Sequence, residues 1–516
     1  MRTITPSFAG STHQLRTARP AVIYYKQLVK ACRSGPRDCQ VVCIDYAAPG
    51  HAKDGHPECP ARLDAITGAL RALTASQRPE LDPLAAALHW RRGSGRLATD
   101  EELRLVHPQA YLDAIRAACG KLTGPKLVDD STYLAPGSFE ECARSTGAVL
   151  DLLDQLLLPP PPPSSRSGSS SSCSNSSGGT AAGGFALVRP PGHHVLPTRP
   201  MGFGVLNTAA VAVRYARQRH GVQRVLIVDF DVHHGNGTQE VFYTDPDTLY
   251  ISTHQAGLWP YTGKVKEVGA GAGRGANINI PLPGGSGDQA MAQAWSRVVL
   301  PAAERFRPQL VLVSAGFDAH WRDPLASMQL TAATYHWMCA ELAELAQRWC
   351  PGRLALVLEG GYHTPSLAES VAASLCGLLL LPPPRSTLLL SPAVQQQAPR
   401  EHPHRRTITT AAAAAAAAAA AVAAGGGDGD RDDQPPRGGL GQGQGQQLQP
   451  PSPPPSRAAA DWRGSISGGS GGGGGDGAIG CAGGVMLPSP GPRELYEEPL
   501  ARVDAVLQEV CSLHGL

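Results

Sequence analysis

The sequence has few of the features that mark secreted, membrane-spanning or nucleic-acid-binding proteins. Its 12 cysteines are scattered over 516 residues without a CxxC pair, which argues against a disulfide framework and against structural zinc fingers. No stretch reaches the roughly 20 uninterrupted apolar residues that span a bilayer, and the Ala-dominated run 411–424 is typical of low-complexity sequence. The formal net charge of +2 gives no reason to expect direct binding of nucleic acid or of a membrane surface.

Acidic residues are missing from the N-terminus. No Asp or Glu precedes Asp38, whereas seven Lys and Arg residues and many Ser and Thr residues do. A basic, hydroxyl-rich segment without acids is typical of an organellar transit peptide. We therefore interpret residues 1–40 as a transit peptide or a disordered tail. The expected location is the chloroplast or the mitochondrion, and the alternative is the cytoplasm or the nucleus.

Two low-complexity blocks interrupt the rest of the chain. Residues 159–184 contain a Pro run, a Ser-rich run and GGTAAGG, and we expect a surface-loop insertion there. Residues 382–492 are rich in Pro, Gln, Ala and Gly, a composition that predicts disorder. The remaining sequence, 41–381, is expected to form a single globular domain.

The C-terminal segment 493–516 has a pattern of its own. Its apolar residues recur at helical spacing, at Leu500, Val503, Val506, Leu507 and Val510. We expect an amphipathic helix that docks on the globular domain, since an exposed apolar stripe is a liability. The alternative is a helix that binds a partner protein.

Between the two blocks, short runs rich in Val, Leu and Ile alternate with helix-like stretches such as 207–218 and 331–349. This alternation predicts an α/β fold, with a mostly parallel sheet covered by helices on both faces. In such sheets, ligands bind beyond the carboxyl ends of the strands. Four predicted strands end in polar clusters, which we therefore take as the candidate site: 185–189, 224–230, 310–315 and 354–359.

Metal chemistry is the first interpretation of these clusters. Asp231 and His233 are two residues apart, so an extended backbone points both side chains the same way. Asp318, from another strand end, is the obvious third ligand. Two carboxylates and one imidazole suit zinc or ferrous iron and leave coordination positions open. Each cluster alone has a plainer explanation, such as a helix cap or a turn, but four strand ends together make coincidence improbable.

The motifs RPPGHH, VDFDVHHGNGTQ, ISTHQ, SAGFDAHWRDPLA and LEGGY, with HPECPARL upstream, resemble the histone deacetylase superfamily. The resemblance covers about 41–381 and is strongest to its class II-like plant and algal branch, which includes organelle-targeted members. It implies an arginase-like fold in one catalytic domain. It also implies zinc-dependent hydrolysis of N-ε-acetyl-lysine in proteins to lysine and acetate, so acetylated proteins are the expected partners.

The resemblance also assigns roles in the reaction. The zinc ligands would be Asp231, His233 and Asp318. His194, beside His193, would act as general base on the metal-bound water and then as general acid. Tyr362 would stabilise the oxyanion.

The same resemblance implies further positions around the metal. The acyl-lysine tunnel and its rim would include Gly202, Phe203, Trp259, Leu325 and Asp130. A structural K⁺ or Na⁺ ion would be bound by Asp229, Asp231, His233, Ser252 and Thr253. A second such site would involve Phe242, Asp245 and Thr248. Asp229 would also lie behind His193. Behind His194 stands Asn236, where class I enzymes carry an aspartate.

The sequence leaves three hypotheses about the substrate and the activity. Polyamine-type relatives place an acidic residue at the tunnel mouth, and the matching residue here is Leu325, which favours acyl-lysine. A small acetylated amine, either a polyamine or an arylalkylamine that stacks on Trp259, is the second hypothesis. A catalytically silent scaffold protein is the third. Tyr362 argues against it, because class II relatives with histidine there are poor deacetylases.

Overall fold

The computed structural model describes residues 40–75, 82–92, 95–158, 181–382, 495 and 497–516. The interpretations of 1–39, 159–180 and 383–494 fall outside these residues and stay predictions. Among the helices that are described, none combines the length and the apolar character that crossing a membrane would require.

An eight-stranded sheet forms the centre of the fold, and all its neighbouring strands are parallel. Its strand order is β2-β1-β5-β10-β9-β6-β7-β8. In chain order the strands are β1 (Gln40–Tyr46), β2 (Leu88–Arg92), β5 (Ala181–Val188), β6 (Val225–Asp229), β7 (Thr248–Gln255), β8 (Asn277–Leu282), β9 (Leu310–Ala315) and β10 (Leu354–Leu358). β5 begins at Ala181, so residues 181–184 of the predicted loop insertion belong to a strand.

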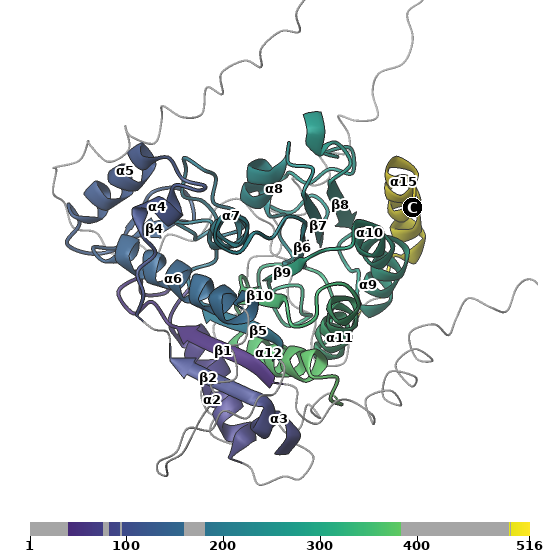
Figure 1. Cartoon of the computed structure of the whole chain (residues 1–516), viewed down its shortest axis with the longest axis horizontal. Coiled ribbons are helices and arrows are strands. Elements are labelled where there is room, and N and C mark those ends of the chain that lie inside the picture. The colour runs from purple at the N-terminus through teal and green to yellow at the C-terminus, as the bar shows by residue number, and fades with distance from the viewer. Residues whose placement is uncertain (1–39, 76–81, 93–94, 159–180, 383–494, 496) are drawn as a thin grey trace, which may run out of the picture. The chain divides into compact units, whose positions relative to one another are not determined.

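Helices cover both faces of the sheet (Figure 1). Alternate residues of β6 point to opposite faces: Leu226 and Val228 join one hydrophobic cluster, and Val225 and Ile227 join the other. The first cluster contains side chains of α2 (Ala61–Thr74), α3 (Asp82–Ala87), α9 (Asp288–Ala294), the π-helical turn η3 (Trp295–Val299), α10 (Leu300–Phe306), α11 (Ala332–Trp349) and α12 (Thr364–Leu378). The second contains side chains of α4 (Asp100–Leu103), α5 (Gln109–Cys119), α6 (Ser138–Leu157), α7 (Thr208–His220) and α8 (Asn236–Phe242). The predicted α/β class with a mostly parallel sheet is confirmed.

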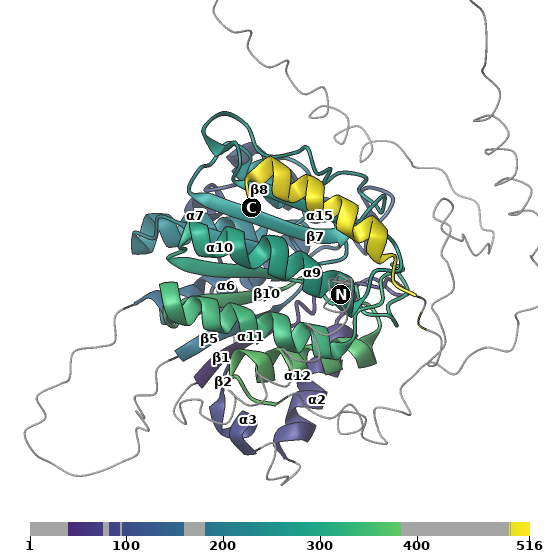
Figure 2. The ribbon, with the colours of Figure 1, turned by 90° about the vertical axis from the view of Figure 1, so that its right-hand side faces the viewer.

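The helix at the C-terminus, α15 (Leu500–His514), lies beside the edge strand β8 in Figure 2. It buries Val503, Leu507 and Val510 in the first hydrophobic cluster. An ion pair joins Arg297 to Asp504, with 2.5 Å between Nη1 and Oδ1. An apolar stripe and polar contacts along the helix therefore hold the end of the chain against the sheet.

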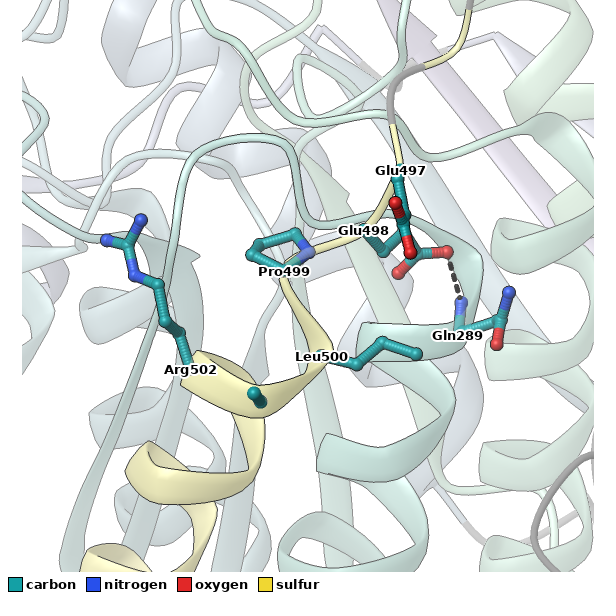
Figure 3. A pocket seen from close by; sticks show the side chains of 7 residues that line it. Gln289, Glu497, Glu498, Pro499, Leu500 and Arg502 are labelled. Atoms are coloured by element: carbon teal, nitrogen blue, oxygen red, sulfur yellow. Dashed lines mark hydrogen bonds between the residues drawn. The ribbon is translucent and has the colours of Figure 1, made fainter.

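Glu498, just before α15, caps another helix. Its carboxylate accepts hydrogen bonds from the backbone N–H groups of Gly287, Gln289 and Ala290 at 2.9, 3.0 and 2.8 Å. Gly287 is the N-cap residue of α9, and Gln289 and Ala290 lie in its first turn. Figure 3 shows the Glu498 carboxylate beside Gln289. An anion at this helix end satisfies N–H groups that have no partner within the helix.

We expect Glu498→Ala to lower the free energy of unfolding by about 1–2 kcal/mol, because three N–H groups of α9 lose a charged acceptor. Thermal unfolding of the full chain measures this loss. Glu497→Ala, at the exposed neighbouring residue, is the matched control and should leave the midpoint within a degree or so. Equal midpoints for the two variants would contradict the capping role.

Candidate active site

The polar clusters of the sequence meet at one edge of the sheet. Strands β5, β10, β9 and β6 are consecutive neighbours in the sheet order and are parallel, so their carboxyl ends lie side by side. The segments that follow them carry the predicted site residues, namely His193, His194, Asp231, His233, Asp318 and Tyr362. The topology thus gathers side chains that are far apart in the sequence.

Asp231, His233 and Asp318 form a group that can hold a metal ion, with one donor atom of each within 4.8 Å of the others. His233 Nδ1 lies 3.2 Å from Asp231 Oδ1 and 3.1 Å from Asp318 Oδ2. The remaining oxygens accept from backbone N–H groups, Asp231 Oδ2 from Gly360 at 2.8 Å and Asp318 Oδ1 from Val232 at 2.9 Å. Each carboxylate therefore has one oxygen that binds a backbone N–H from another segment and one that lies beside the imidazole. The second oxygen of Asp231 also accepts the backbone N–H of His233 at 2.9 Å. This set of three donors fits a divalent ion such as zinc.

Glycine at two positions lets the loops approach these carboxylates. A Cβ at Gly316 would collide with the Asp231 carboxylate, and a Cβ at Gly360 would collide with the carboxylates of both Asp318 and Asp231. Gly316 follows β9 and Gly360 follows β10. The segments after β9 and β10 can therefore approach these carboxylates only because residues 316 and 360 have no side chain.

Gly316→Ala is expected to displace Asp231 and to abolish stoichiometric metal binding while the protein stays folded. Gly68→Ala is the matched control, because a Cβ at this exposed residue of α2 meets nothing within 4 Å. That substitution should raise helix stability by up to about 1 kcal/mol. Metal content after dialysis, with circular dichroism for the fold, compares the two variants. A fully metal-loaded Gly316→Ala protein would refute the assigned geometry.

The two histidines after β5 have different partners. His193 Nδ1 lies 3.0 Å from Asp229 Oδ2, and that carboxylate oxygen also accepts from the Tyr250 hydroxyl at 3.0 Å. His194 Nδ1 lies 2.9 Å from the amide oxygen of Asn236. Since an amide oxygen only accepts, Nδ1 of His194 carries the proton, and the neutral ring keeps its lone pair on Nε2.

Because their partners differ, the two imidazoles also differ in charge. Burial disfavours protonation of both rings. At His193 the Asp229 carboxylate outweighs burial and raises the pKa to about 10. At His194 burial and the neighbouring His193 and His233 rings hold the pKa well below its ordinary value. The pair thus places a neutral base next to a charged imidazole, with 3.9 Å between ring centroids.

Aromatic rings surround the approach to this cluster. The partly buried Trp259 meets His194 edge-on, at 4.7 Å between centroids. Phe203 meets Tyr362 edge-on at 5.5 Å. Burial holds the pKa of the Tyr362 hydroxyl well above its ordinary value, so the group is a hydrogen-bond donor. Gly202, at φ +59°, has no space for a Cβ because the His194 ring occupies it. The predicted tunnel residues therefore lie beside the predicted catalytic residues.

The predicted rim residue Asp130 and the predicted gate residue Leu325 lie on two separate segments. Asp130 is exposed in the loop between the short strands β3 (Lys126–Leu127) and β4 (Tyr133–Leu134). Thr132 of the same loop accepts a hydrogen bond from the backbone N–H of Phe203 at 3.1 Å. Leu325 is half-buried and follows Asp318 by seven residues.

The residues of the two predicted monovalent-cation sites are also brought together. Asp229 and Ser252 are partners in the β6–β7 register, and Thr253 Oγ1 is buried without a hydrogen-bond partner among the described residues. In the second predicted site, Thr248 Oγ1 lies 3.3 Å from Asp245, near the end of α8 at Phe242. The Asp245 carboxylate is ion-paired with Arg214 and Arg217, so side chains already compensate its charge.

Two buried charged residues that the sequence did not single out support the same loops. Arg62 donates to the carbonyl oxygens of Gly361 at 2.7 Å and Glu359 at 2.5 Å. The Glu359 carboxylate accepts from the N–H groups of Gly192 at 2.6 Å and His193 at 3.2 Å. Burial raises the pKa of Glu359 to about 7. Both residues stand in the quoted motifs HPECPARL and LEGGY, but only the tertiary contacts indicate what they hold.

A third such residue is Asp323, which stands in the quoted motif SAGFDAHWRDPLA. It is buried, and its carboxylate accepts from three backbone N–H groups. Burial and the nearby charge of Asp318 raise its pKa to about 7.

Comparison with known proteins identifies the family. The histone deacetylase domain family matches residues 56–378, and the chain belongs to this family of hydrolases. It is 42% identical over 347 residues to a rice protein named "Histone deacetylase 10, chloroplastic", covering 65% of this chain and 72% of that one. It is 36% identical over 343 residues to the human protein named "Polyamine deacetylase HDAC10", covering 63% and 45%. The crystal structure of the HDA15 HD domain is similar with a TM-score of 0.56 and 34% identity, covering 69% of this chain and 94% of that one.

Proposed function

We propose that the protein is a zinc-dependent deacetylase that hydrolyses N-ε-acetyl-lysine in proteins. The observation that carries this proposal is the convergence of three parts on one edge of the sheet. These parts are the three metal-binding side chains, a neutral His194 and the hydroxyl donor Tyr362. A metal group alone would support binding only, whereas a base and an oxyanion donor beside it support hydrolysis.

The proposed reaction assigns one task to each side chain. Zinc held by Asp231, His233 and Asp318 would supply Lewis acidity toward the acetyl carbonyl and the attacking water. His194 takes the proton of that water as it attacks the carbonyl carbon. Tyr362 donates a hydrogen bond to the oxygen that becomes negatively charged. His194 then protonates the leaving amine, which yields acetate and a free lysine.

Leu325 supports acyl-lysine as the substrate. An apolar residue at the tunnel mouth offers no carboxylate to the second ammonium group of a polyamine, and burial of such a charge without a partner is unfavourable. A small acetylated arylalkylamine is the second candidate, because the partly buried ring of Trp259 next to His194 offers an aromatic surface.

We also propose that the protein acts in the chloroplast. The basic N-terminus without acids supports an organellar address, and the rice relative is named chloroplastic. Chloroplast proteins with acetylated lysines are then the proposed substrates, rather than histones.

Tyr362→Phe is the sharpest test of the proposed function. Removal of one oxyanion donor is expected to lower kcat on an acetyl-lysine peptide by roughly 10²–10³-fold, while the bound zinc remains. The assay compares turnover and zinc content of the wild-type full chain and the variant. Absence of wild-type turnover on acetyl-lysine peptides, or a variant as fast as the wild type, would reject the proposal.

Leu325→Glu tests the substrate assignment. A carboxylate at the tunnel mouth should raise kcat/KM for an N-acetylated diamine by roughly two- to fivefold, the range for a partly exposed ion pair, and should lower it for acetyl-lysine peptides. Leu325→Met, which keeps an apolar side chain of similar volume, is the control. If both variants keep the wild-type ratio of the two substrates, residue 325 is not the gate.

A further inference from the structure

The buried carboxylate of Asp323 joins two segments of the active site. Its Oδ1 accepts the backbone N–H of Leu325 at 3.1 Å. Its Oδ2 accepts the N–H groups of Tyr362 at 2.7 Å and His363 at 3.2 Å. Only 2% of the residue is exposed. Both oxygens are therefore committed to backbone groups, one on the segment of the gate and the other on the loop of the tyrosine.

The loop that carries Tyr362 depends on such external contacts. Two glycines precede the tyrosine, and Gly361 has a φ of +116°, a conformation that is open to glycine alone among the common residues. A backbone with this freedom does not by itself determine where the next side chain points. Its peptide groups are held instead from two sides, by Arg62 at the carbonyl of Gly361 and by Asp323 at the N–H of Tyr362.

The direction of the peptide sets the position of the tyrosine hydroxyl. The ring packs edge-on against Phe203, and the guanidinium of Arg62 lies 5.0 Å from its centroid. These contacts restrict the ring only if its backbone stays in place. A displacement of about 1 Å of a catalytic group can lower a rate by roughly a hundredfold.

We propose that Asp323 is a positioning residue that acts on the reaction through Tyr362 and ties the tyrosine loop to the gate segment at Leu325. The inference rests on the proposed function, in which Tyr362 stabilises the oxyanion. Asp323 itself does not touch the substrate, because its acceptor oxygens face the protein backbone.

A double-mutant cycle with the full chain tests this role. Asp323→Asn keeps the size of the side chain but replaces one acceptor oxygen by an NH₂ group, so one of the two segments loses its acceptor. We expect this variant to lower kcat on an acetyl-lysine peptide by roughly 10- to 100-fold, with KM changed less than about threefold and zinc content unchanged. In the Tyr362→Phe background the same substitution should cost less than about threefold, because the group it positions is gone.

Asp288→Asn is the matched control for the loss of a carboxylate acceptor. Asp288 accepts from Thr331 N–H at 2.9 Å and from the Thr334 hydroxyl at 2.6 Å, at the N-terminus of α11. Its substitution should lower thermal stability and leave kcat within about twofold. If Asp323→Asn does not fold, Asp323→Glu serves in the same cycle. It retains both oxygens on a stem longer by one methylene and shifts the Tyr362 N–H group.

The outcomes separate the two proposals. Wild-type turnover by Tyr362→Phe alone would overturn the oxyanion role and, with it, the positioning role of Asp323. A slow Tyr362→Phe enzyme that loses a further 10- to 100-fold upon Asp323→Asn would overturn only the positioning role. Wild-type kcat in Asp323→Asn would do the same.

Discussion

The site depends on the hydrogen-bond partners of two buried carboxylates. Asp231 and Asp318 each accept a backbone N–H of another strand end with one oxygen and direct the other toward the His233 imidazole. The Asp231 oxygen that faces the imidazole also accepts the backbone N–H of His233 at 2.9 Å. The N–H groups from the other strand ends belong to Gly360 and Val232, which follow β10 and β6. The arrangement therefore exists only when these strand ends lie close together, and the glycines at 316 and 360 leave the space that this approach requires.

The burial of several carboxyl groups in one region needs compensation. Asp229, Asp231, Asp318, Asp323 and Glu359 are all buried within this one region of the sheet edge, and isolated carboxylates are costly in such surroundings. Backbone N–H groups and the imidazoles of His193 and His233 compensate part of this charge. A divalent cation in the group of three donors would relieve the repulsion between Asp231 and Asp318. The proposed metal thus answers an electrostatic need of the folded chain as well as a chemical one.

Contacts outside the group of Asp231, His233 and Asp318 also hold this edge of the sheet together. Arg62 and Asp323 approach the loop after β10 from opposite sides of the peptide chain and bind its carbonyl and N–H groups. At the edge of the sheet formed by β8, α15 packs beside the strand. Glu498, just before α15, caps α9. The C-terminal helix therefore belongs to the same folded body as the strands that carry the site.

The sequence by itself determined the class of the fold and the residues that end each central strand. Short apolar runs rich in Val, Leu and Ile predict buried parallel strands. The motifs after 185–189, 224–230, 310–315 and 354–359 contain the predicted metal, base and tyrosine positions. Only the tertiary structure decided the start of β5 at Ala181 and the pairing of Asp245 with two arginines. It also decided the roles of Arg62, Glu359 and Asp323. These residues act on backbone groups distant in the sequence, and no local periodicity records such contacts.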